Sequence, residues 1–473
     1  MSIEKIKFGT DGWRALIAER FTVENVARIT LGVSAWLKQH FDQPTVVLGH
    51  DCRFAGELFA ETIARILARE GVEVLMAQDF VSTPMVSLGT VSHQASLGII
   101  LTASHNPPGY HGYKLKGHYG GPLLPDGIAA VEQEIPDVSN YHHTGGTSLA
   151  EFIDQGKVKI VELEAEYLAK VRGSFDIDAI HQSNLHLAYD AMYGAGQRVV
   201  PQLLPKVRLF RCEHNPHFHG IAPEPILRNL GLYSSFIQAV GDLDCGLATD
   251  GDADRIGLMD GNGQYVDSHH IMLLLIHYLH HYKGWTGKVI TGFSSTVKIA
   301  QLCKHYGLDL EVVPIGFKHI CGRMLETDVL RGGEESGGFG VIGYIPERDG
   351  IWNGLVLWEF MATSGKTIRE LIDEVYALVG SFAFQRIDLH LPETEKQAIV
   401  AHCKAGGFAQ FGDLKVNRFE DLDGFKYYFN ADEWVMIRPS GTEPVLRTYA
   451  EAGTAEKAAA ILEATHQEMR QLF

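Results

Sequence analysis

A serine stands where a strand is expected to end, in the stretch LTASHNPPG at residues 101–109. The apolar run LGIIL before it is typical of a buried strand, and NPPG after it favours a turn. Ser104 is therefore expected at the carboxyl edge of a sheet, where α/β proteins bind their ligands. Serine is also common in turns, so residue type and place alone do not make it reactive.

Three carboxylates alternate in ATDGDADRIG at residues 248–257, again directly after an apolar run. Asp250, Asp252 and Asp254 repel one another unless a cation neutralises them, and hard oxygen ligands favour Mg²⁺ or Ca²⁺. An EF-hand is excluded, because its sixth position would be Arg255 instead of glycine and its twelfth Gly261 instead of glutamate. The alternative is a solvated acidic turn. Three alternating aspartates followed by arginine indicate a small hard cation.

Two further loops carry groups that could bind a phosphosugar. In RGGEESGGFG at 331–340, Glu334, Glu335 and Ser336 lie between glycines, where the backbone can approach a ligand closely and the side chains can bond the hydroxyls of a polyol. The alternative is a merely flexible acidic loop.

The second loop is RPSGTEP at 438–444. It combines a guanidinium, hydroxyls and backbone amides, which suit a phosphate. It lacks the Gly-Lys-Ser/Thr ending of a Walker loop, and the alternative is a tight turn with a surface arginine.

Basic residues follow or precede these motifs. Arg14 lies in the glycine-rich segment FGTDGWR, Lys114 follows the serine loop, and Lys318 lies in IGFKHI. His105, next to the serine, could equally cap the turn. A serine, a divalent cation, cationic surroundings, a hydroxyl-binding loop and a separate phosphate site together indicate phosphoryl transfer on a sugar.

The elements that position these motifs alternate between short apolar strands and amphipathic helices. TVVLGHD at 45–51 predicts a strand, and the next helix is expected to bury one face, formed by Leu58, Phe59, Ile63, Ile66 and Leu67. This βαβ pattern predicts mixed, mainly parallel sheets. Residues 141–156 are interpreted as a linker, and the pattern changes to α+β after about residue 378. We expect three α/β domains at 1–150, 151–266 and 267–378, and an α+β domain at 379–473.

Composition narrows the class of protein. A length of 473 residues exceeds one core, and the net charge of −17 disfavours nucleic acid or an anionic membrane as a partner. The six cysteines are scattered without a C-x-x-C pair, which argues against a disulfide framework or a zinc knuckle. No apolar run is long enough to span a bilayer. We expect a cytoplasmic enzyme that acts on small molecules and is a monomer or a small homo-oligomer.

The motifs TASHNP, DGDADR, GEESGG and RPSGTEP, in this order, resemble those of the α-D-phosphohexomutases, the phosphoglucomutase/phosphomannomutase superfamily. The similarity runs nearly end to end, and it implies four domains, three α/β and one α+β, around a central cleft. It implies that Ser104 is carried as a phosphoserine and that its phosphate, Asp250, Asp252 and Asp254 hold Mg²⁺. Arg14 would neutralise the transferred phosphoryl group, and Lys114 is the candidate proton shuttle, with His105 second. Expected substrate contacts come from Glu334, Ser336, Lys318, Arg255, Arg438, Ser440, Gly441 and Thr442.

The resemblance implies interconversion of hexose 1-phosphate and hexose 6-phosphate through a hexose 1,6-bisphosphate. Its Glu-Glu-Ser sugar loop is similar to that of the phosphoglucomutases, whereas the mannose and glucosamine branches tend to have Gln or Met in the middle and His at the position of Gly338. Glucose is therefore the expected sugar, with glucose 1,6-bisphosphate as activator. The alternatives are a phosphomannomutase, a phosphoglucosamine mutase, a metal-dependent phosphatase or a non-catalytic phosphosugar-binding paralogue. DCRFAG keeps Asp51 and Arg53 of the family pattern but lacks the serine often found beyond them.

Overall fold

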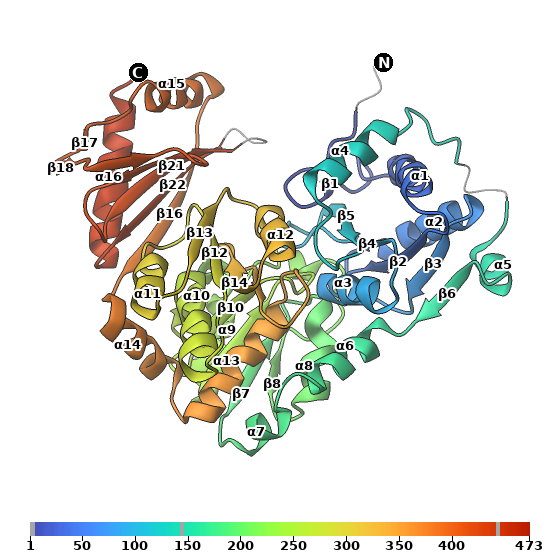
Figure 1. Cartoon of the computed structure of the whole chain (residues 1–473), viewed down its shortest axis with the longest axis horizontal. Coiled ribbons are helices and arrows are strands. Elements are labelled where there is room, and N and C mark those ends of the chain that lie inside the picture. Colours follow the sequence, from blue (N-terminus) through green and yellow to red (C-terminus); the bar gives the residue numbers. More distant parts are fainter. Residues whose placement is uncertain (1–4, 142–145, 441–444) are drawn as a thin grey trace.

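Four sheets follow one another along the chain. The structure is a computed structural model that describes residues 5–141, 146–440 and 445–473. In Figure 1 the first domain and the C-terminal domain form two arms, and the second and third domains lie between them.

The first sheet has the strand order β1-β5-β4-β2-β3-β6. Its strands are β1 (Trp13–Leu16), β2 (Thr45–His50), β3 (Glu73–Ala77), β4 (Leu97–Leu101), β5 (Tyr110–Gly117) and β6 (Val158–Val161). The helices of this segment are α1 (Val23–His40), α2 (Gly56–Arg69), α3 (Thr83–Ser92), α4 (Pro125–Glu134) and α5 (Leu149–Asp154). Strands β4, β2, β3 and β6 are parallel, so that the ends of β2 and β4 lie side by side, with His50 opposite Leu101. Strand β5 pairs antiparallel with β4 and β1.

The second and third sheets are also mixed, with parallel strands at one edge and antiparallel strands at the other. The strand order of the second sheet is β11-β10-β9-β7-β8. Its strands are β7 (Leu187–Asp190), β8 (Arg208–Phe210), β9 (Cys245–Thr249), β10 (Ile256–Asp260) and β11 (Tyr265–Val266). The helices of this segment are α6 (Leu163–Arg172), α7 (Ile177–Gln182), α8 (Val199–Leu203) and α9 (Gly231–Val240). The strand order of the third sheet is β13-β12-β14-β15. Its strands are β12 (Lys288–Gly292), β13 (Leu310–Val313), β14 (Val329–Gly333) and β15 (Phe339–Val341). The helices of this segment are α10 (Ser268–His277), α11 (Lys298–Tyr306), α12 (Phe317–Glu326), α13 (Gly350–Ser364) and α14 (Ile368–Val379).

The C-terminal sheet is wholly antiparallel, in the order β16-β22-β21-β20-β19. Its strands are β16 (Ala383–His390), β19 (Arg418–Glu420), β20 (Phe425–Tyr428), β21 (Trp434–Pro439) and β22 (Val445–Ala452). Helices α15 (Glu393–Lys404) and α16 (Ala455–Arg470) and the short pair β17 (Gln410–Phe411) and β18 (Leu414–Lys415) complete this part. The predicted fold class, mixed α/β sheets followed by an α+β domain, is confirmed.

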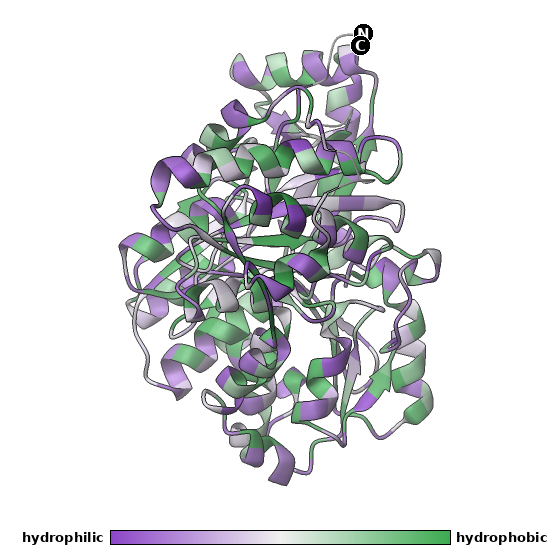
Figure 2. Cartoon of the chain, turned by 90° about the vertical axis from the view of Figure 1, so that its right-hand side faces the viewer, coloured by the Kyte–Doolittle hydropathy of each residue, from purple (hydrophilic) through white to green (hydrophobic). Residues whose placement is uncertain are grey.

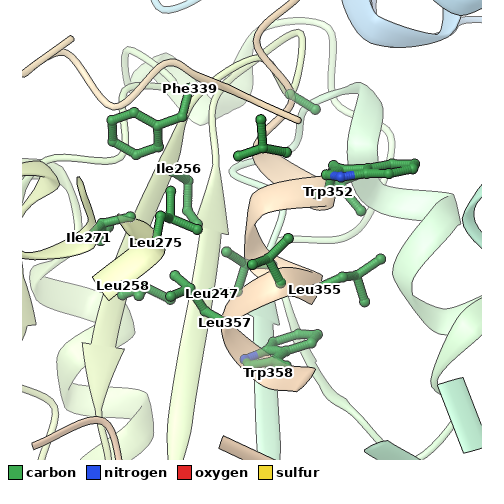
Figure 3. Close-up of a cluster of buried hydrophobic side chains, with 14 of the residues drawn as sticks. Leu247, Ile256, Leu258, Ile271, Leu275, Phe339, Trp352, Leu355, Leu357 and Trp358 are labelled. Atoms are coloured by element: carbon green, nitrogen blue, oxygen red, sulfur yellow. The ribbon is translucent and has the colours of Figure 1, made fainter. Parts of the chain in front are cut away.

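Helix α13 belongs to the third segment but packs on the second sheet. Figure 3 shows side chains of α13, Leu357 among them, in one buried cluster with Leu247 and Leu258 of that sheet. A side-chain carbon at Gly354 would lie 2.3 Å from a methyl group of Leu247, so glycine permits this close approach. At the start of α13, the Gly350 amide donates to the Ala253 carbonyl at 2.9 Å, which anchors the helix to the acidic loop.

Two expectations about elements need correction. Leu58, predicted on the buried face of its helix, is 43% exposed, while Phe59, Ile63, Ile66 and Leu67 are buried. The reason is that α2 covers the sheet with a narrower face than the apolar pattern suggests. The predicted linker at 141–156 contains α5, which a capping box begins at Ser148, and residues 142–145 of it lie outside the described residues. Strand β6 then extends the first sheet beyond residue 150, and the predicted domain boundaries stay a proposal.

Hydrophilic and hydrophobic residues are interspersed along the helices in Figure 2. Among the described residues, no helix combines the length and apolar character needed to cross a membrane.

Candidate functional site

Ser104 lies just beyond β4, fully buried and in the left-handed backbone region with φ +52°. That conformation is uncommon for a residue other than glycine and needs support from its surroundings. The Ser104 amide donates to Thr102 Oγ1 at 2.8 Å, and the Thr102 hydroxyl donates to Asp51 Oδ2 at 2.5 Å. The end of β2 thus supports the turn that follows β4.

Arg53 fixes the rest of the serine loop. Its guanidinium donates to the carbonyl oxygens of Ser104 at 2.6 Å and Asn106 at 2.7 Å, and to those of Pro107 and Tyr110 at 3.0 Å each. The Asp51 carboxylate lies 3.4 Å from Arg53 Nε, and both side chains are fully buried. Burial raises the pKa of Asp51 to about 6, although Arg53 acts in the opposite direction. The sequence showed this pair only as part of a motif; the contacts show that it holds the serine loop.

The three aspartates of the acidic loop come together beside the serine. Each offers one oxygen within 4.8 Å of the others, and the Ser104 hydroxyl donates to Asp250 Oδ2 at 2.7 Å. A side-chain carbon at Gly251 would lie 2.5 Å from the Ser104 carbonyl, so glycine lets the two loops touch. Burial, with the neighbouring Asp252 and Asp254 carboxylates, raises the pKa of Asp250 well above its usual value.

This cluster fits a hard divalent cation. Asp252 Oδ1 and Asp254 Oδ1 are buried and have no hydrogen-bond partner among the described residues, although a buried carboxylate oxygen is costly unless it is paired. Three carboxylates that converge with such oxygens form the donor set that Mg²⁺ prefers.

Cations hold the opposite oxygens of the same carboxylates. Lys114 Nζ lies 2.8 Å from Asp252 Oδ2 and from Asp11 Oδ2, and 3.2 Å from Asp254 Oδ2. Arg348 Nη2 lies 2.6 Å from Asp254 Oδ2 and from Asp11 Oδ2. Asp252 and Asp254 therefore each have one oxygen bonded to a cation and one without a partner. Burial lowers the pKa of Lys114, but the three carboxylates outweigh burial and raise it above its usual value. Proton transfer by Lys114 stays a prediction.

Sequence reasoning missed Arg348 and assigned no role to Asp11. Asp11 could have been suspected, because it lies three residues before Arg14 in the same glycine-rich segment. Arg348 gives no such signal, since it follows the sugar loop in PERDG at no informative spacing. Thr83, at the start of α3, was also missed; its hydroxyl donates to Asp252 Oδ2 at 2.6 Å.

Arg14 and His105 both lie against the serine loop. Arg14 Nη1 donates to Asn106 Oδ1 at 2.6 Å, and the guanidinium lies 3.6 Å from Asp11. His105 Nδ1 is 3.4 Å from Ser104 Oγ. Burial, followed by the positive charges of Arg255 and Arg14, holds the pKa of His105 well below its usual value. These effects favour the neutral imidazole of His105 beside the serine hydroxyl.

The sugar loop borders the acidic loop. The Ile256 amide donates to the Gly337 carbonyl at 2.9 Å, and the positive φ of +88° at Gly337 suits this turn. Glu334 Oε1 accepts the Gly316 amide at 2.5 Å. Burial, followed by repulsion from Glu335, raises the pKa of Glu334 to about 7. Ser336 is half-buried on the same loop.

The remaining predicted residues fall into two groups. The Arg255 amide donates to Asp250 Oδ1 at 3.0 Å, and Lys318, on α12, lines a cavity of about 190 Å³ with Thr10 and Asp11; both therefore belong to the region of the serine. Arg438 and Ser440 lie on the C-terminal domain, where the Arg438 guanidinium donates to Asp423 and the Ser440 carbonyl accepts from Lys396 Nζ at 2.9 Å. Gly441 and Thr442 lie outside the described residues.

The fold and this grouping define a multidomain α/β protein with a serine and a three-carboxylate site at facing sheet edges. The sequence matches all four domains described as phosphoglucomutase/phosphomannomutase: α/β/α domain I at residues 5–142, domain II at 165–263, domain III at 267–379 and the C-terminal domain at 392–467. The chain therefore belongs to the phosphoglucomutase/phosphomannomutase family, as its motifs predicted.

Relatives that are named after different sugar substrates have similar sequence identity to this chain. A phosphoglucomutase/phosphomannomutase from Thermococcus kodakarensis is 30% identical, over 96% of each chain. A phosphoglucomutase from Staphylococcus haemolyticus is 28% identical, over 94% of this chain and 90% of its own. A crystal structure of a "putative phosphomannomutase" from Thermus thermophilus superposes with a TM-score of 0.87 at 31% identity, over 99% of both chains. Other relatives are named phosphoglucosamine mutases.

Proposed function

We propose that the protein interconverts glucose 1-phosphate and glucose 6-phosphate, with Ser104 as the residue that carries the phosphoryl group. The observation that supports this most directly is the buried Ser104 hydroxyl, which donates to one of three converging carboxylates while Arg53 holds its loop. A phosphoserine gives its phosphoryl group to the free hydroxyl of the sugar phosphate, which yields a bisphosphate and the serine hydroxyl. The bisphosphate then returns its other phosphoryl group to Ser104 and leaves as the isomer.

Asp250, Asp252 and Asp254 would hold Mg²⁺ in this reaction. When bound, the ion neutralises charge on the phosphoryl oxygens. Lys114 and Arg348 would orient the carboxylates, since they hold the Oδ2 atoms of Asp252 and Asp254 and leave the Oδ1 atoms to the ion. Arg14, which is bonded to the serine loop, adds positive charge beside the phosphoryl group. Such preorganised charges stabilise a phosphoryl-transfer transition state without moving during the reaction.

The sugar and the distal phosphate would be held by separate elements. Glu334 and Ser336 are proposed to bond sugar hydroxyls, and Lys318 and Arg255 line the same region. Arg438 and Ser440, with Gly441 and Thr442, are proposed to bind the phosphate that is not being transferred. A ligand bound at both ends must bridge the first and the last domain, so its binding energy can exclude water from the phosphoserine.

Glucose is preferred in this proposal because of the sugar loop. Glu335 is the middle residue, and a side-chain carbon at Gly338 would lie 2.4 Å from Cδ of Arg348. A histidine at position 338, as the mannose and glucosamine branches tend to have, would therefore require the Arg348 side chain to shift.

The test is to incubate the protein with glucose 1-phosphate, Mg²⁺ and a trace of glucose 1,6-bisphosphate. We expect glucose 6-phosphate to form faster than mannose 6-phosphate or glucosamine 6-phosphate does from the corresponding 1-phosphates. Free phosphate as the main product would identify a phosphatase instead, and a faster reaction of another sugar would overturn the glucose assignment. No reaction with any of the three sugars would indicate a binding protein.

A further inference from the structure

Asp423 bonds the arginine of the C-terminal domain and the backbone of the third domain at the same time. Its Oδ1 accepts from Arg438 Nε at 3.1 Å, and its Oδ2 accepts from Arg438 Nη2 at 3.2 Å. The same Oδ2 accepts the backbone N–H of Ile315 at 2.8 Å. The carboxylate is 25% exposed and the guanidinium 19%, so both lie partly shielded from water between the two domains.

The local backbone is suited to this contact. Gly424, which follows Asp423, has φ +108°, and a side-chain carbon there would lie 3.1 Å from both Arg438 Cβ and the Ile437 carbonyl oxygen. Glycine thus lets the turn before β20 lie directly against β21, which brings Asp423 to the guanidinium. A bidentate carboxylate fixes the plane of an arginine fork. Bonds to the described residues use two of the five guanidinium N–H groups, so three of them are not used by that part of the chain and can face a phosphate.

The Ile315 loop continues the connection to the sugar loop. The next amide along the chain, that of Gly316, donates to Glu334 Oε1 at 2.5 Å. Two consecutive amides therefore bond a carboxylate of the C-terminal domain and a carboxylate of the sugar loop. Lys318 follows two residues later, at the start of α12.

We propose that Asp423 is a positioning residue that links the distal-phosphate site at Arg438 to the sugar loop at Glu334. It fixes the direction of the Arg438 fork, and through the Ile315 and Gly316 amides it makes the position of that fork depend on the position of Glu334. This role rests on the proposed function, in which Arg438 binds the distal phosphate. The opposite role is that of an internal competitor, a carboxylate that occupies Arg438 and must leave before phosphate binds.

The two roles predict opposite changes in phosphate affinity. The probe is inorganic phosphate, titrated into the full chain and followed by heteronuclear NMR. Asp423→Ala is expected to raise its Kd about tenfold, because the Arg438 fork is no longer fixed. Asp423→Asn keeps the size of the side chain and one acceptor oxygen, so a smaller rise is expected. A lower Kd in either variant would identify a competitor and overturn the proposal.

Two controls separate positioning from general docking of the domains. Asp432 accepts from Lys298 Nζ at 2.6 Å, another carboxylate contact between these domains that does not involve Arg438. Asp432→Ala is expected to leave the phosphate Kd unchanged, and an equal rise there would overturn the proposal. In an Arg438→Ala background, Asp423→Ala should not change the phosphate Kd any further, because Asp423 acts through that arginine. A further rise in the Kd would contradict this role.

Hydrogen exchange tests the connection without any turnover. Exchange at the Ile315 amide is expected to accelerate at least tenfold in Asp423→Ala and to stay unchanged in Asp432→Ala. Unchanged exchange at Ile315 in Asp423→Ala would overturn the connection. The variants could behave as expected while the native chain isomerises no sugar phosphate. That result would refute the proposed function and leave the role of Asp423 intact.

Discussion

Replacing Arg53 by methionine tests whether catalysis depends on how the serine loop is held. The change removes hydrogen bonds to four carbonyl oxygens, one of them that of Ser104, and leaves Asp51 buried without its cation. Breaking a buried ion pair by removing one partner costs about 3–5 kcal/mol. We expect the free energy of unfolding to fall by about that amount. A displacement of about 1 Å at a reacting group costs on the order of 10²-fold in rate, so kcat is expected to fall to about one hundredth.

The stability loss and the activity loss have different causes, and a second variant separates them. In the native chain burial already raises the pKa of Asp51 to about 6, and Arg53 opposes that rise. Without Arg53 the pKa rises further, so Asp51 binds a proton near neutral pH and part of the stability loss is avoided. Asp51→Asn combined with Arg53→Met removes the unpaired charge altogether. It is expected to regain stability in urea unfolding but not kcat.

The assay is the initial rate with glucose 1-phosphate at saturating Mg²⁺, measured beside urea unfolding of the same samples. The reasoning would be refuted if Arg53→Met kept kcat within twofold of the native chain. It would also be refuted if the double variant recovered kcat together with stability, because the loop geometry would then be irrelevant.

Three further perturbations have definite expected outcomes. Ser104→Ala should abolish isomerisation and the phosphopeptide that forms in the native chain on incubation with glucose 1,6-bisphosphate; activity near the native value would contradict the assignment. Burial raises the pKa of Glu334 to about 7, so Glu334 contributes stability that is fully present below the usual value of about 4.5 and is lost as pH rises towards 7. In thermal melts between pH 4.5 and 7.5, Glu334→Gln should therefore lose less stability with rising pH than the native chain does. An identical pH dependence in the two chains would count against the raised pKa of Glu334. Arg331 is fully buried, and within the described part of the chain none of its three guanidinium nitrogens has a hydrogen-bond partner. Because an unpaired buried charge is costly, Arg331→Met should raise Tm by several degrees, and a fall would show that the packing of the guanidinium over Phe339 outweighs its charge.

The sequence predicted those parts of the site that follow strands directly. Ser104, the aspartate loop and Glu334 each begin within three residues of the end of a buried strand, and apolar runs locate such strands well. That the serine and aspartate loops meet could be expected only in general terms, because the contact depends on how two sheets face each other. The touching backbones at Gly251 and Ser104 have no counterpart in local pattern.

Arg348 and Asp423 show what local pattern cannot supply. Arg348 bonds residues more than ninety positions away in the sequence, and Asp423 bonds the Ile315 amide, more than a hundred positions away. Long-range ion pairs leave no periodicity, so neither residue could be distinguished from an ordinary surface charge. The predicted burial of Leu58 was wrong for a related reason. Helical periodicity fixes the direction of an apolar stripe but not how much of that stripe a neighbouring element covers.

The packing of α13 on the second sheet has a consequence for how the chain melts. The largest core joins side chains from the first three segments, including Val47, Leu247 and Leu355, whereas the main core of the C-terminal domain, around Ile437 and Ile461, is separate. A smaller buried cluster, in which Phe293 packs with Trp434 and Met436, joins that domain to the third segment. Regions that share a core open as one cooperative unit, and a region with a separate core can open alone. Calorimetry should therefore resolve two transitions, a smaller one for residues 383–470 and a larger one for the body. A chain that stops after α14 should keep the larger transition, with the serine and its aspartates in place and the distal arginine removed.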